Sequence, residues 1–277
     1  MAPYPTFAMA SDLSDALIDA SLAGGFGRPF RLFEVIESTN EHALGWLKEG
    51  APEGALVVAD QQTAGRGRRG RVWESRPGEA LLFSLVLRPR GPSEVIELLT
   101  TTLGVACADA IEDVCNLEVG LKWPNDVMVG EQKLAGILVE SRVTGGSMGG
   151  AVAGIGINVR GAPDDAGQAF STPATSIAAA GVPDASVPSR AELLGAVISS
   201  FEALYLGLGE LDLREEVRRR ATDRSTILGK RVSVRFADGS VAEGRAEQLT
   251  ASGALVLDRG GATVILGVGE IERVRPG

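Results

Sequence analysis

The stretch GRGRRGR occupies residues 65–71, and Trp73 follows it after one further residue. Three glycines and four arginines in seven positions cannot pack into a core, because the glycines cost backbone entropy and the guanidinium groups are costly to desolvate. The stretch is therefore predicted to be a loop. Such a loop can bring its backbone close to an anion and surround it with planar, permanently charged donors. It favours a phosphate-type ligand; a solvated basic turn and a nucleic-acid contact stay open as alternatives.

The composition around this loop is that of a soluble globular protein. The chain has 277 residues, of which 44% are hydrophobic and 23% charged, which suits one medium-sized domain and one small domain. No apolar run is long enough to span a membrane, and residues 1–28 lack the basic start and apolar centre of a secretory signal. We therefore expect a cytoplasmic protein without a membrane partner.

Charge and rare residues narrow the classes of function. The formal net charge of -9 argues against broad nucleic-acid binding, which normally uses a basic surface. The single histidine, His42, excludes a His-rich metal site and would have to serve in any serine-histidine-aspartate triad. Cys107 and Cys115 are too few for a disulfide framework and are expected to be buried packing residues of a helix.

Hydrophobic periodicity predicts the secondary structure. Strands are expected at 31–36, 55–60, 81–87 and 151–159, with a hairpin of two short strands around 130–132. Helices are expected at 11–23, from Ser38 onward, at about 93–115, and once or twice within 191–220. Beyond a boundary near 221–228, four short strands separated by glycine-containing turns are typical of a small antiparallel barrel; they are expected at 231–236, 241–248, 254–257 and 263–266.

Three polar or glycine-rich clusters fall outside this framework. Ser38 and Glu41 have capping-box spacing, which accounts for those two residues but not for Thr39 and Asn40 between them. Lys133 starts a strand, so its ammonium group could reach toward a ligand held by Asn125 and Asp126; the alternative is an exposed lysine on a strand edge.

Glycines also interrupt the strand AVAGIGINV at 151–159. Because glycine weakens a strand, they suggest that a ligand or a neighbouring backbone approaches closely. The third glycine and following helix of a dinucleotide-binding fingerprint are missing. Residues 145–150 are expected to form a flexible turn, and 160–190 a mobile surface segment with a short helix near 177–180.

Taken in order, these clusters resemble those of biotin–protein ligase, also called biotin–[acetyl-CoA carboxylase] ligase, over nearly the whole chain from Phe33 onward. The matching segments are Ser38-Thr39-Asn40, Gln62 with 65–71 and Trp73, KWPND at 122–126, KLAGILVE at 133–140, GIGINV at 154–159, and Ala174-Thr175-Ser176. Six segments in the same order with compatible spacing are highly specific.

The resemblance implies an α+β fold. A mixed central β-sheet with helices packed on it would form the core shared by class II synthetase-like biotin and lipoate ligases, and a small SH3-like β-barrel would follow. The catalytic domain would span 1–224 and the barrel 225–277. About 30 residues precede the match, too few for the N-terminal helix-turn-helix of the repressor members. An enzyme-only protein that does not bind DNA is therefore expected.

The resemblance also implies a two-step reaction. Biotin and ATP would form biotinyl-5′-adenylate and pyrophosphate, and a lysine of a biotin carboxyl carrier domain of an acyl-CoA or pyruvate carboxylase would then displace AMP. Bringing the biotin carboxylate to about 4 Å from an α-phosphate oxygen costs about 4 kcal/mol at an effective dielectric constant of about 20, so cations including Mg2+ are needed. The protein would be a monomer or a weak homodimer.

Residue roles follow from the resemblance alone. The implied catalytic residues are Lys133, Arg68 and Arg66. The implied biotin-binding residues are Ser38, Thr39, Asn40, Gln62, Gly65, Arg66, Arg68, Lys133, Gly136, Gly154 and Gly156. The implied ATP-binding residues are Arg68, Arg69, Arg71, Trp73, Asn125, Lys133 and Asn158. The implied magnesium ligands are Asp126 and Asn125.

Three other functions remain to be separated from this one. A lipoate–protein ligase or acyltransferase shares the core architecture but not the Arg/Gly loop, and substrate competition would distinguish it. A non-enzymatic nucleic-acid binder predicts affinity that falls steeply with salt and does not depend on biotin. A biotin-sensing scaffold would bind without turnover, which the presence of Lys133 and Asp126 argues against.

Overall fold

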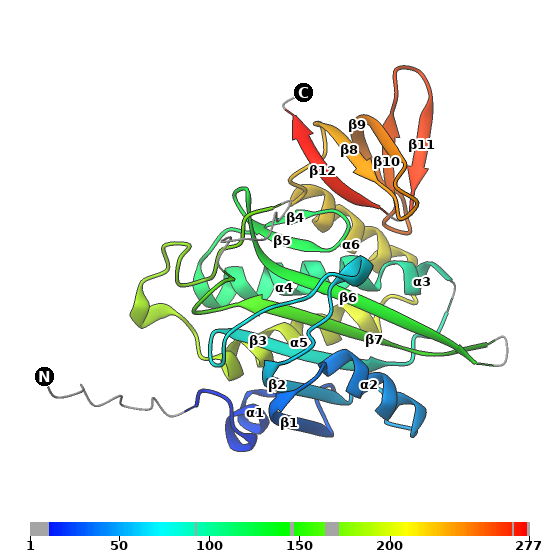
Figure 1. Cartoon of the computed structure of the whole chain (residues 1–277). Helices are drawn as coiled ribbons and strands as arrows, with labels where there is room; N and C mark the ends of the chain where they lie inside the picture. Colours follow the sequence, from blue (N-terminus) through cyan, green and yellow to red (C-terminus); the bar gives the residue numbers. More distant parts are fainter. Residues whose placement is uncertain (1–10, 92, 145–146, 164–171, 268, 276–277) are drawn as a thin grey trace, which may run out of the picture.

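A seven-stranded sheet organises the larger part of the protein (Figure 1). The computed structural model describes residues 11–91, 93–144, 147–163, 172–267 and 269–275. The strands, in the spatial order β1-β2-β3-β7-β6-β5-β4, are β1 (Phe30–Ile36), β2 (Leu56–Gln62), β3 (Ala80–Leu87), β4 (Gly120–Lys122), β5 (Asp126–Val129), β6 (Gln132–Thr144) and β7 (Ser147–Asn158). β1 and β2 run parallel and the other neighbours antiparallel. The mixed central sheet is therefore confirmed.

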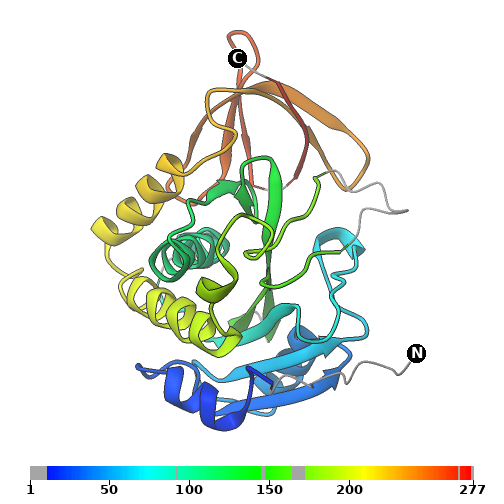
Figure 2. The ribbon, with the colours of Figure 1, turned by 90° about the vertical axis from the view of Figure 1, so that its left-hand side faces the viewer.

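Helices cover both faces of this sheet. They are α1 (Asp15–Ser21), α2 (Thr39–Lys48), α3 (Ser93–Glu97), α4 (Leu99–Cys115), α5 (Arg190–Leu206) and α6 (Leu211–Asp223). α4 and α5 pack together on one face, and α6 packs on α4, whereas α2 packs against β2, β3 and β7. Figure 2 shows the 63–79 loop on the side of the sheet opposite α4, α5 and α6. Among the described helices, none is both long and apolar enough to cross a bilayer.

The alternation of side chains along β7 decides which face carries a site. Ala151, Ala153, Ile155 and Ile157 point into the main core with α4 and α5, while Val152 belongs to the smaller core under α2. Because side chains alternate along a strand, Gly154, Gly156 and Asn158 lie on the same face as α2. Gly154 pairs with Leu138 and Gly156 with Gly136 on β6, and Asn158 pairs with Ala80 on β3. The glycines thus open the α2 face next to the α2 N-terminus.

The C-terminal strands form a separate five-stranded antiparallel sheet. Its order is β11-β10-β9-β8-β12, built from β8 (Arg231–Arg235), β9 (Val241–Leu249), β10 (Leu255–Asp258), β11 (Thr263–Leu266) and β12 (Glu270–Arg275). The sequence predicted the first four strands and missed β12. Trp123 joins the two sheets, since its indole Nε1 donates to the carbonyl oxygen of Gly253 at 3.1 Å. The antiparallel C-terminal unit is confirmed, and the boundary at 224/225 stays a prediction.

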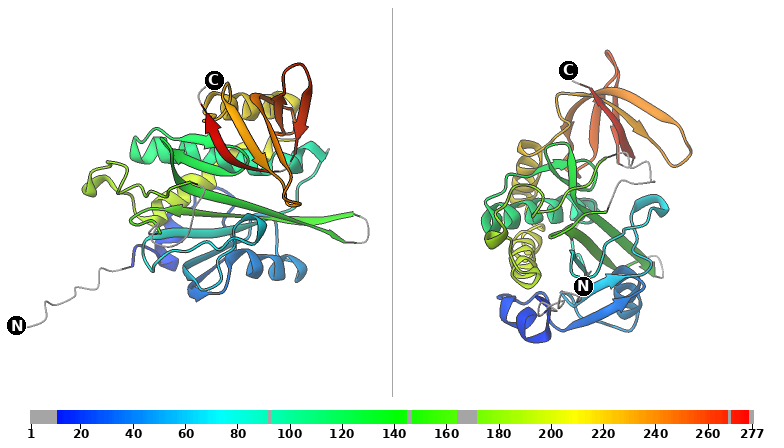
Figure 3. Two further views of the ribbon diagram at one scale, coloured as in Figure 1. Left: turned by 45° about the horizontal axis from the view of Figure 1, so that its top comes forward. Right: turned by 60° about the vertical axis from the view of Figure 1, so that its left-hand side comes forward.

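Several local expectations need correction. The helix expected at 93–115 is two helices, α3 and α4, which meet at Leu98. Residues 147–150, expected in a flexible turn, pair with β6 as the start of β7, so that these two long strands extend past their neighbours (Figure 3); residues 145–146 lie outside the described part. The second strand of the predicted hairpin, β6, is 13 residues long rather than short.

The segment 160–190 also differs from its prediction as a mobile surface region. Thr175, Ser176 and Ile177 are buried. The N–H of Thr175 donates to the carbonyl of Lys133, and the N–H of Ile177 donates to the carbonyl of Asn158. The short helix expected near 177–180 is a turn, and residues 164–171 lie outside the described part. Hydrogen bonds to distant strands are not visible in local periodicity.

The two cysteines agree with their prediction. Cys107 and Cys115 are free and buried in α4. Burial raises the pKa of the Cys115 thiol to about 11 and raises that of Cys107 as well. Both are therefore unreactive packing residues.

Candidate active site

One pocket on the α2 face collects residues that are far apart in the sequence. The 66–74 loop, the 122–126 segment, β6, β7 and the N-terminus of α2 line it together. Every residue assigned a role by resemblance contributes to this lining except Gly65. Gly65 sits just behind it, where an added Cβ would collide with the backbone oxygen of Trp73. The structure thus assembles the predicted set, while the role of each residue stays a prediction.

The Arg/Gly stretch is a loop, as predicted. It folds back on itself through hydrogen bonds from the N–H of Gly67 to the carbonyl of Arg71 at 2.8 Å and from Trp73 to Gly65 at 2.9 Å. Between them, Arg69 has a φ of 59° in the left-handed region, a conformation that a non-glycine residue adopts only at some cost. These hydrogen bonds close the stretch that carries the four arginines into a small loop.

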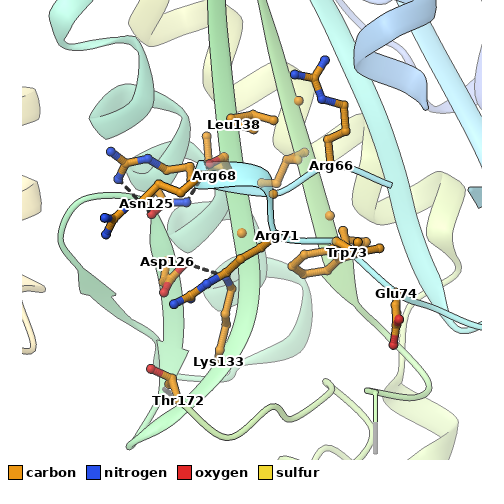
Figure 4. Close-up of a pocket in the computed structure, with 18 of the residues that line it drawn as sticks. Arg66, Arg68, Arg71, Trp73, Glu74, Asn125, Asp126, Lys133, Leu138 and Thr172 are labelled. Carbon is orange, nitrogen blue, oxygen red and sulfur yellow. Dashed lines mark hydrogen bonds and ion pairs between the residues drawn. The ribbon is translucent and has the colours of Figure 1, made fainter. Parts of the chain in front are cut away.

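Two of these arginines contact opposite sides of the pocket. Arg66 forms ion pairs with Glu41 at the start of α2 and with Glu140 on β6, at 3.0 Å in the second case. The Nη1 atom of Arg68 lies 3.4 Å from Oδ1 of Asn125. In the view of Figure 4, Arg66 points away from the group formed by Arg71, Asp126 and Lys133. The loop thus carries positive charge to both ends of the pocket.

Lys133 is held in the pocket and is not a free strand-edge lysine. Its Nζ lies 2.6 Å from Oδ1 of Asp126 and 5.5 Å from the centre of the Trp73 ring. Its backbone N–H donates to Pro173, and its carbonyl accepts from Thr175. The side chain is 27% exposed, so the ammonium group faces the pocket while part of it remains reachable by a ligand.

The strand glycines make room for side chains rather than for a neighbouring backbone. The Trp73 ring lies against β6 and β7, so that a Cβ at Gly156 would be 2.5 Å from Cε2 of Trp73, and one at Gly136 would be 2.9 Å from Cζ3. A Cβ at Gly154 would collide with Asn40. The predicted close approach is therefore present, and the approaching groups are Trp73 and Asn40. The indole Nε1 of Trp73 is buried without a hydrogen-bond partner in the described residues.

A buried polar network lies beneath this surface. The backbone N–H of Thr39 donates to Oε1 of Gln62 at 2.7 Å, and the Thr39 hydroxyl lies 2.8 Å from that of Ser84. Ser84 also lies 2.6 Å from Oδ1 of Asn40, whose Nδ2 is 2.9 Å from Glu140. The N-cap role of Ser38 is confirmed, whereas the side chain of its expected capping partner, Glu41, pairs with Arg66.

Sequence reasoning missed Ser84 and Glu140. A signal was present for each: Ser84 is the single polar residue in the strand ALLFSLVL at 80–87, and Glu140 ends the KLAGILVE segment, two positions beyond Leu138 on the same face. Neither signal identifies a partner. Only the sheet register, which pairs Ser84 and Leu138 with Gly154, brings these side chains to Asn40.

Two further contributions come from distant segments. The guanidinium of Arg69 donates to the carbonyls of Arg235 and Phe236 at the end of β8, so the residue expected at ATP is engaged by the C-terminal sheet. Gly269 and Ile271, at β12, line the pocket. The C-terminal unit therefore forms part of the pocket wall, which sequence patterns did not indicate.

The predicted magnesium ligands fit an ion that is held mainly by a substrate. Among the described residues, no group of three or more His, Cys, Asp or Glu side chains could hold a metal. Asp126 supplies a carboxylate, but Lys133 occupies one of its oxygens, and the Asn125 amide donates to Ile137. Mg2+ typically keeps waters and uses one or two carboxylates together with substrate phosphates. Asp126 suits that kind of binding and not a protein cage.

Asn158 contributes a buried group at the C-terminal end of β7. Its Nδ2 donates to the carbonyl of Thr175 at 2.9 Å, while its Oδ1 is buried without a hydrogen-bond partner in the described residues. The side chain is 1% exposed. A buried acceptor left unpaired is costly, so this oxygen is available to a donor on a ligand that enters the pocket.

Comparisons with known proteins agree with this geometry. Residues 32–158 match the Biotin/lipoate A/B protein ligase family, and residues 227–274 match the Biotin protein ligase C terminal domain. The biotin--[acetyl-CoA-carboxylase] ligase of Mycobacterium tuberculosis is 32% identical over 259 residues, which cover 91% of this chain and 92% of the relative. The chain belongs to the biotin protein ligase family.

Other members differ in extent. The bifunctional ligase/repressor BirA of Bacillus subtilis is 37% identical over 172 residues, so this chain spans about half of that protein's length, 52%. A solved biotin protein ligase from Aquifex aeolicus, in complex with biotin and ATP, superposes with a TM-score of 0.73 at 26% identity, covering 90% of this chain and all of that one. The biotin protein ligase fold thus includes both sheets described above.

Proposed function

We propose that this biotin protein ligase family member uses ATP to attach biotin to a lysine of a biotin carboxyl carrier domain. One observation carries the proposal: a single pocket unites the arginine loop, the Lys133–Asp126 ion pair and the buried polar network at Thr39 and Gln62. The first two suit the phosphates of a nucleotide, and the third suits an uncharged head group with donors and acceptors. The Aquifex relative, solved in complex with biotin and ATP, supports binding of both ligands.

In the first step, a carboxylate oxygen of biotin attacks the α-phosphorus of ATP. The new O–P bond gives biotinyl-5′-adenylate, and the bond to the β-phosphate breaks to release pyrophosphate. Lys133 and Arg68 offset the repulsion between the two anions and stabilise the charge that develops on the phosphoryl oxygens. Asp126 orients Lys133 from the side. Mg2+, bound chiefly by the triphosphate, would supply further charge neutralisation at Asp126.

In the second step, the uncharged amine of a carrier lysine attacks the carbonyl carbon of the adenylate, and AMP leaves with the bonding electron pair. No side-chain nucleophile of the ligase is needed. The loop keeps water from the mixed anhydride until the carrier arrives. Trp73, which lies over Gly136 and Gly156, would stack near the adenine, and Asn158 would lie on the nucleotide side.

Substrate recognition and organisation complete the proposal. Ser38, Thr39 and Gln62 would serve the ureido group of biotin. Residues 1–224 would form the catalytic domain and 225–277 the C-terminal domain. The carrier partners would be biotin carboxyl carrier domains of acyl-CoA and pyruvate carboxylases. A cytoplasmic monomer or weak homodimer that does not bind DNA is the expected state.

The test combines two measurements on the full chain. Intact mass spectrometry of a biotin carboxyl carrier domain, after incubation with the protein, Mg-ATP and biotin, should show one biotin-sized adduct. Pyrophosphate release should depend on biotin and should not be supported by lipoate. Release with lipoate in place of biotin would favour lipoate ligation, and neither product, with an active control ligase, would contradict ligation altogether.

A further inference from the structure

Glu140 occupies the point at which the arginine loop meets the buried network. Its carboxylate, on β6, accepts from Nδ2 of Asn40 through Oε2 at 2.9 Å and pairs with Arg66 through Oε1 at 3.0 Å. The side chain is 23% exposed, so both bonds are partly shielded from water. One carboxylate therefore links a loop residue to a residue of α2.

Asn40 connects Glu140 to residues in the interior of the protein by hydrogen bonds. The residue is 4% exposed, and its Nδ2 also donates to the carbonyl of Leu138 at 3.2 Å. Its Oδ1 accepts from the Ser84 hydroxyl at 2.6 Å, in a space that exists because Gly154 has no side chain. The polar atoms of Asn40 are thus engaged by protein groups. This arrangement makes Asn40 a connecting residue within the structure.

Hydrogen bonds of the Ser84 and Thr39 hydroxyl groups extend this network to the pocket. The Ser84 hydroxyl carries one hydrogen, and the amide oxygen of Asn40 can only accept, so Ser84 donates to Asn40. The same hydroxyl lies 2.8 Å from that of Thr39, which donates to Oε1 of Gln62 at 3.1 Å. The N–H of Thr39 holds Oε1 of Gln62 at 2.7 Å, so the network engages the oxygen of Gln62 and not its amino group. The orientation of Gln62 therefore depends on a hydrogen-bond network that begins at Glu140.

We propose that Glu140 is a positioning residue that couples closure of the 65–73 loop to the arrangement of Thr39 and Gln62. This inference rests on the proposed function, in which Thr39 and Gln62 receive the head of biotin. Arg66 has a second carboxylate partner, Glu41, but that side chain is 56% exposed, and exposed ion pairs contribute little. Glu140 is the partner that the loop and the network share. When the loop opens, the network loses the ion pair between Arg66 and Glu140.

Two variants test this hydrogen-bond network at two different points. Glu140→Gln keeps the size of the side chain but presents no charge to Arg66, whereas Ser84→Ala interrupts the network at a fully buried position. Glu216→Gln is the matched control, because it removes the carboxylate of the exposed Glu216–Arg219 pair on α6. Each variant is measured for biotin affinity by calorimetry without ATP, for the rate of tryptic cleavage within 66–71, for KM against kcat, and for Tm.

The coupling predicts that each variant changes both the affinity for biotin and the rate of loop cleavage. Loss of one hydrogen bond to a charged group should raise the Kd for biotin by about tenfold in Glu140→Gln, with an increase in the KM for biotin larger than the change in kcat. Ser84→Ala should also accelerate cleavage of the loop, although Ser84 does not touch it. The double variant should add less than about twofold to either single variant, because both break the same chain.

Three results would overturn the coupling: variants that match Glu216→Gln, Ser84→Ala with altered affinity but an unchanged loop, or additive effects in the double variant. If Glu140→Gln fails to fold, Glu140→Asp shortens the same link and tests it again. Loop cleavage is measured on the biotin-free protein. A wild-type protein that does not bind biotin, but whose loop opens in both variants, would refute the proposed function and leave the coupling standing.

Discussion

The Nζ atom of Lys133 lies 2.6 Å from Oδ1 of Asp126 across the β5–β6 hairpin, and the absence of a side chain at Gly136 permits this contact. Gly136 pairs directly with Asp126 in the register of the two strands. A Cβ at Gly136 would lie 3.0 Å from both Cε and Nζ of Lys133. The side chain of Lys133 therefore runs along its own strand and over Gly136, and its ammonium group lies beside the carboxylate of Asp126.

Replacing Lys133 by alanine should slow adenylate formation by about 100-fold or more, the scale observed when one preorganised stabiliser of a transition state is lost. The measurement is single-turnover pyrophosphate release with saturating biotin and Mg-ATP. Lys230→Ala, at an exposed position before β8, is the control. A rate within about threefold of the wild type would show that Lys133 does not act on the reacting groups.

Arg68→Ala should make the bound intermediate leak. Arg68 reaches Asn125 from the loop, and losing a charged donor of this kind should shorten retention of the adenylate by about tenfold. Retention is followed by trapping labelled adenylate on the protein and measuring its release into solution. Arg231→Ala, on the exposed face of β8, is the control. An adenylate that stays bound as long as in the wild type would refute this role.

Gly156→Ala should displace Trp73, because the new methyl group would lie 2.5 Å from Cε2 of the indole. Overpacking of this kind costs about 1–3 kcal/mol, so Tm should fall and the tryptophan fluorescence should shift. Gly45→Ala is the matched control: no atom lies within 4 Å of its added Cβ, and alanine within a helix should stabilise α2 by about 0.5–1 kcal/mol. Equal Tm values for the two variants would contradict the packing of Trp73 on the strand.

Arg69→Ala should loosen the loop from the C-terminal sheet. Its guanidinium bonds to the Arg235 and Phe236 carbonyls should be worth about 0.5–1.5 kcal/mol each. Hydrogen exchange at the amides of Gly67 and Arg71 should therefore accelerate by about threefold or more. Arg76→Ala, which removes an exposed arginine paired with Glu79, should leave both amides unchanged. Unchanged exchange in Arg69→Ala would show that the contact does not hold the loop.

His42 should make stability depend on pH below neutrality. Burial is the main cause that lowers the pKa of His42 from its ordinary value of 6.5, and the nearby Arg31 lowers it further, while Glu49 opposes the shift. Between the lowered pKa and 6.5, the unfolded chain therefore binds more protons than the folded one. The contribution of neutral His42 to the free energy of unfolding is complete above pH 6.5 and is lost as the pH falls toward the lowered pKa. Thermal unfolding of wild type and His42→Gln should diverge over this range. Parallel curves would contradict the shift.

The sequence by itself determined most of the elements and the type of site. Short-range periodicity is enough for the strands at Phe30–Ile36 and Ala80–Leu87 and for the helix that Ser38 caps, because each pattern repeats within a few residues. The concentration of glycine and arginine at 65–71 identified the loop for a similarly local reason. The ordered motifs from Ser38 to Ser176 led to the biotin protein ligase family.

Only the tertiary structure decided how those residues meet. Ser84 and Glu140 reach the site through strand register. Ile271 on β12 and Gly269 just before it reach the site through packing of one sheet on another. Both register and packing depend on residues far apart in the chain. The contact of Arg69 with the end of β8 has the same origin. Local patterns carry no information on such pairings, because the free energy that selects them comes from burial and hydrogen bonding between distant segments.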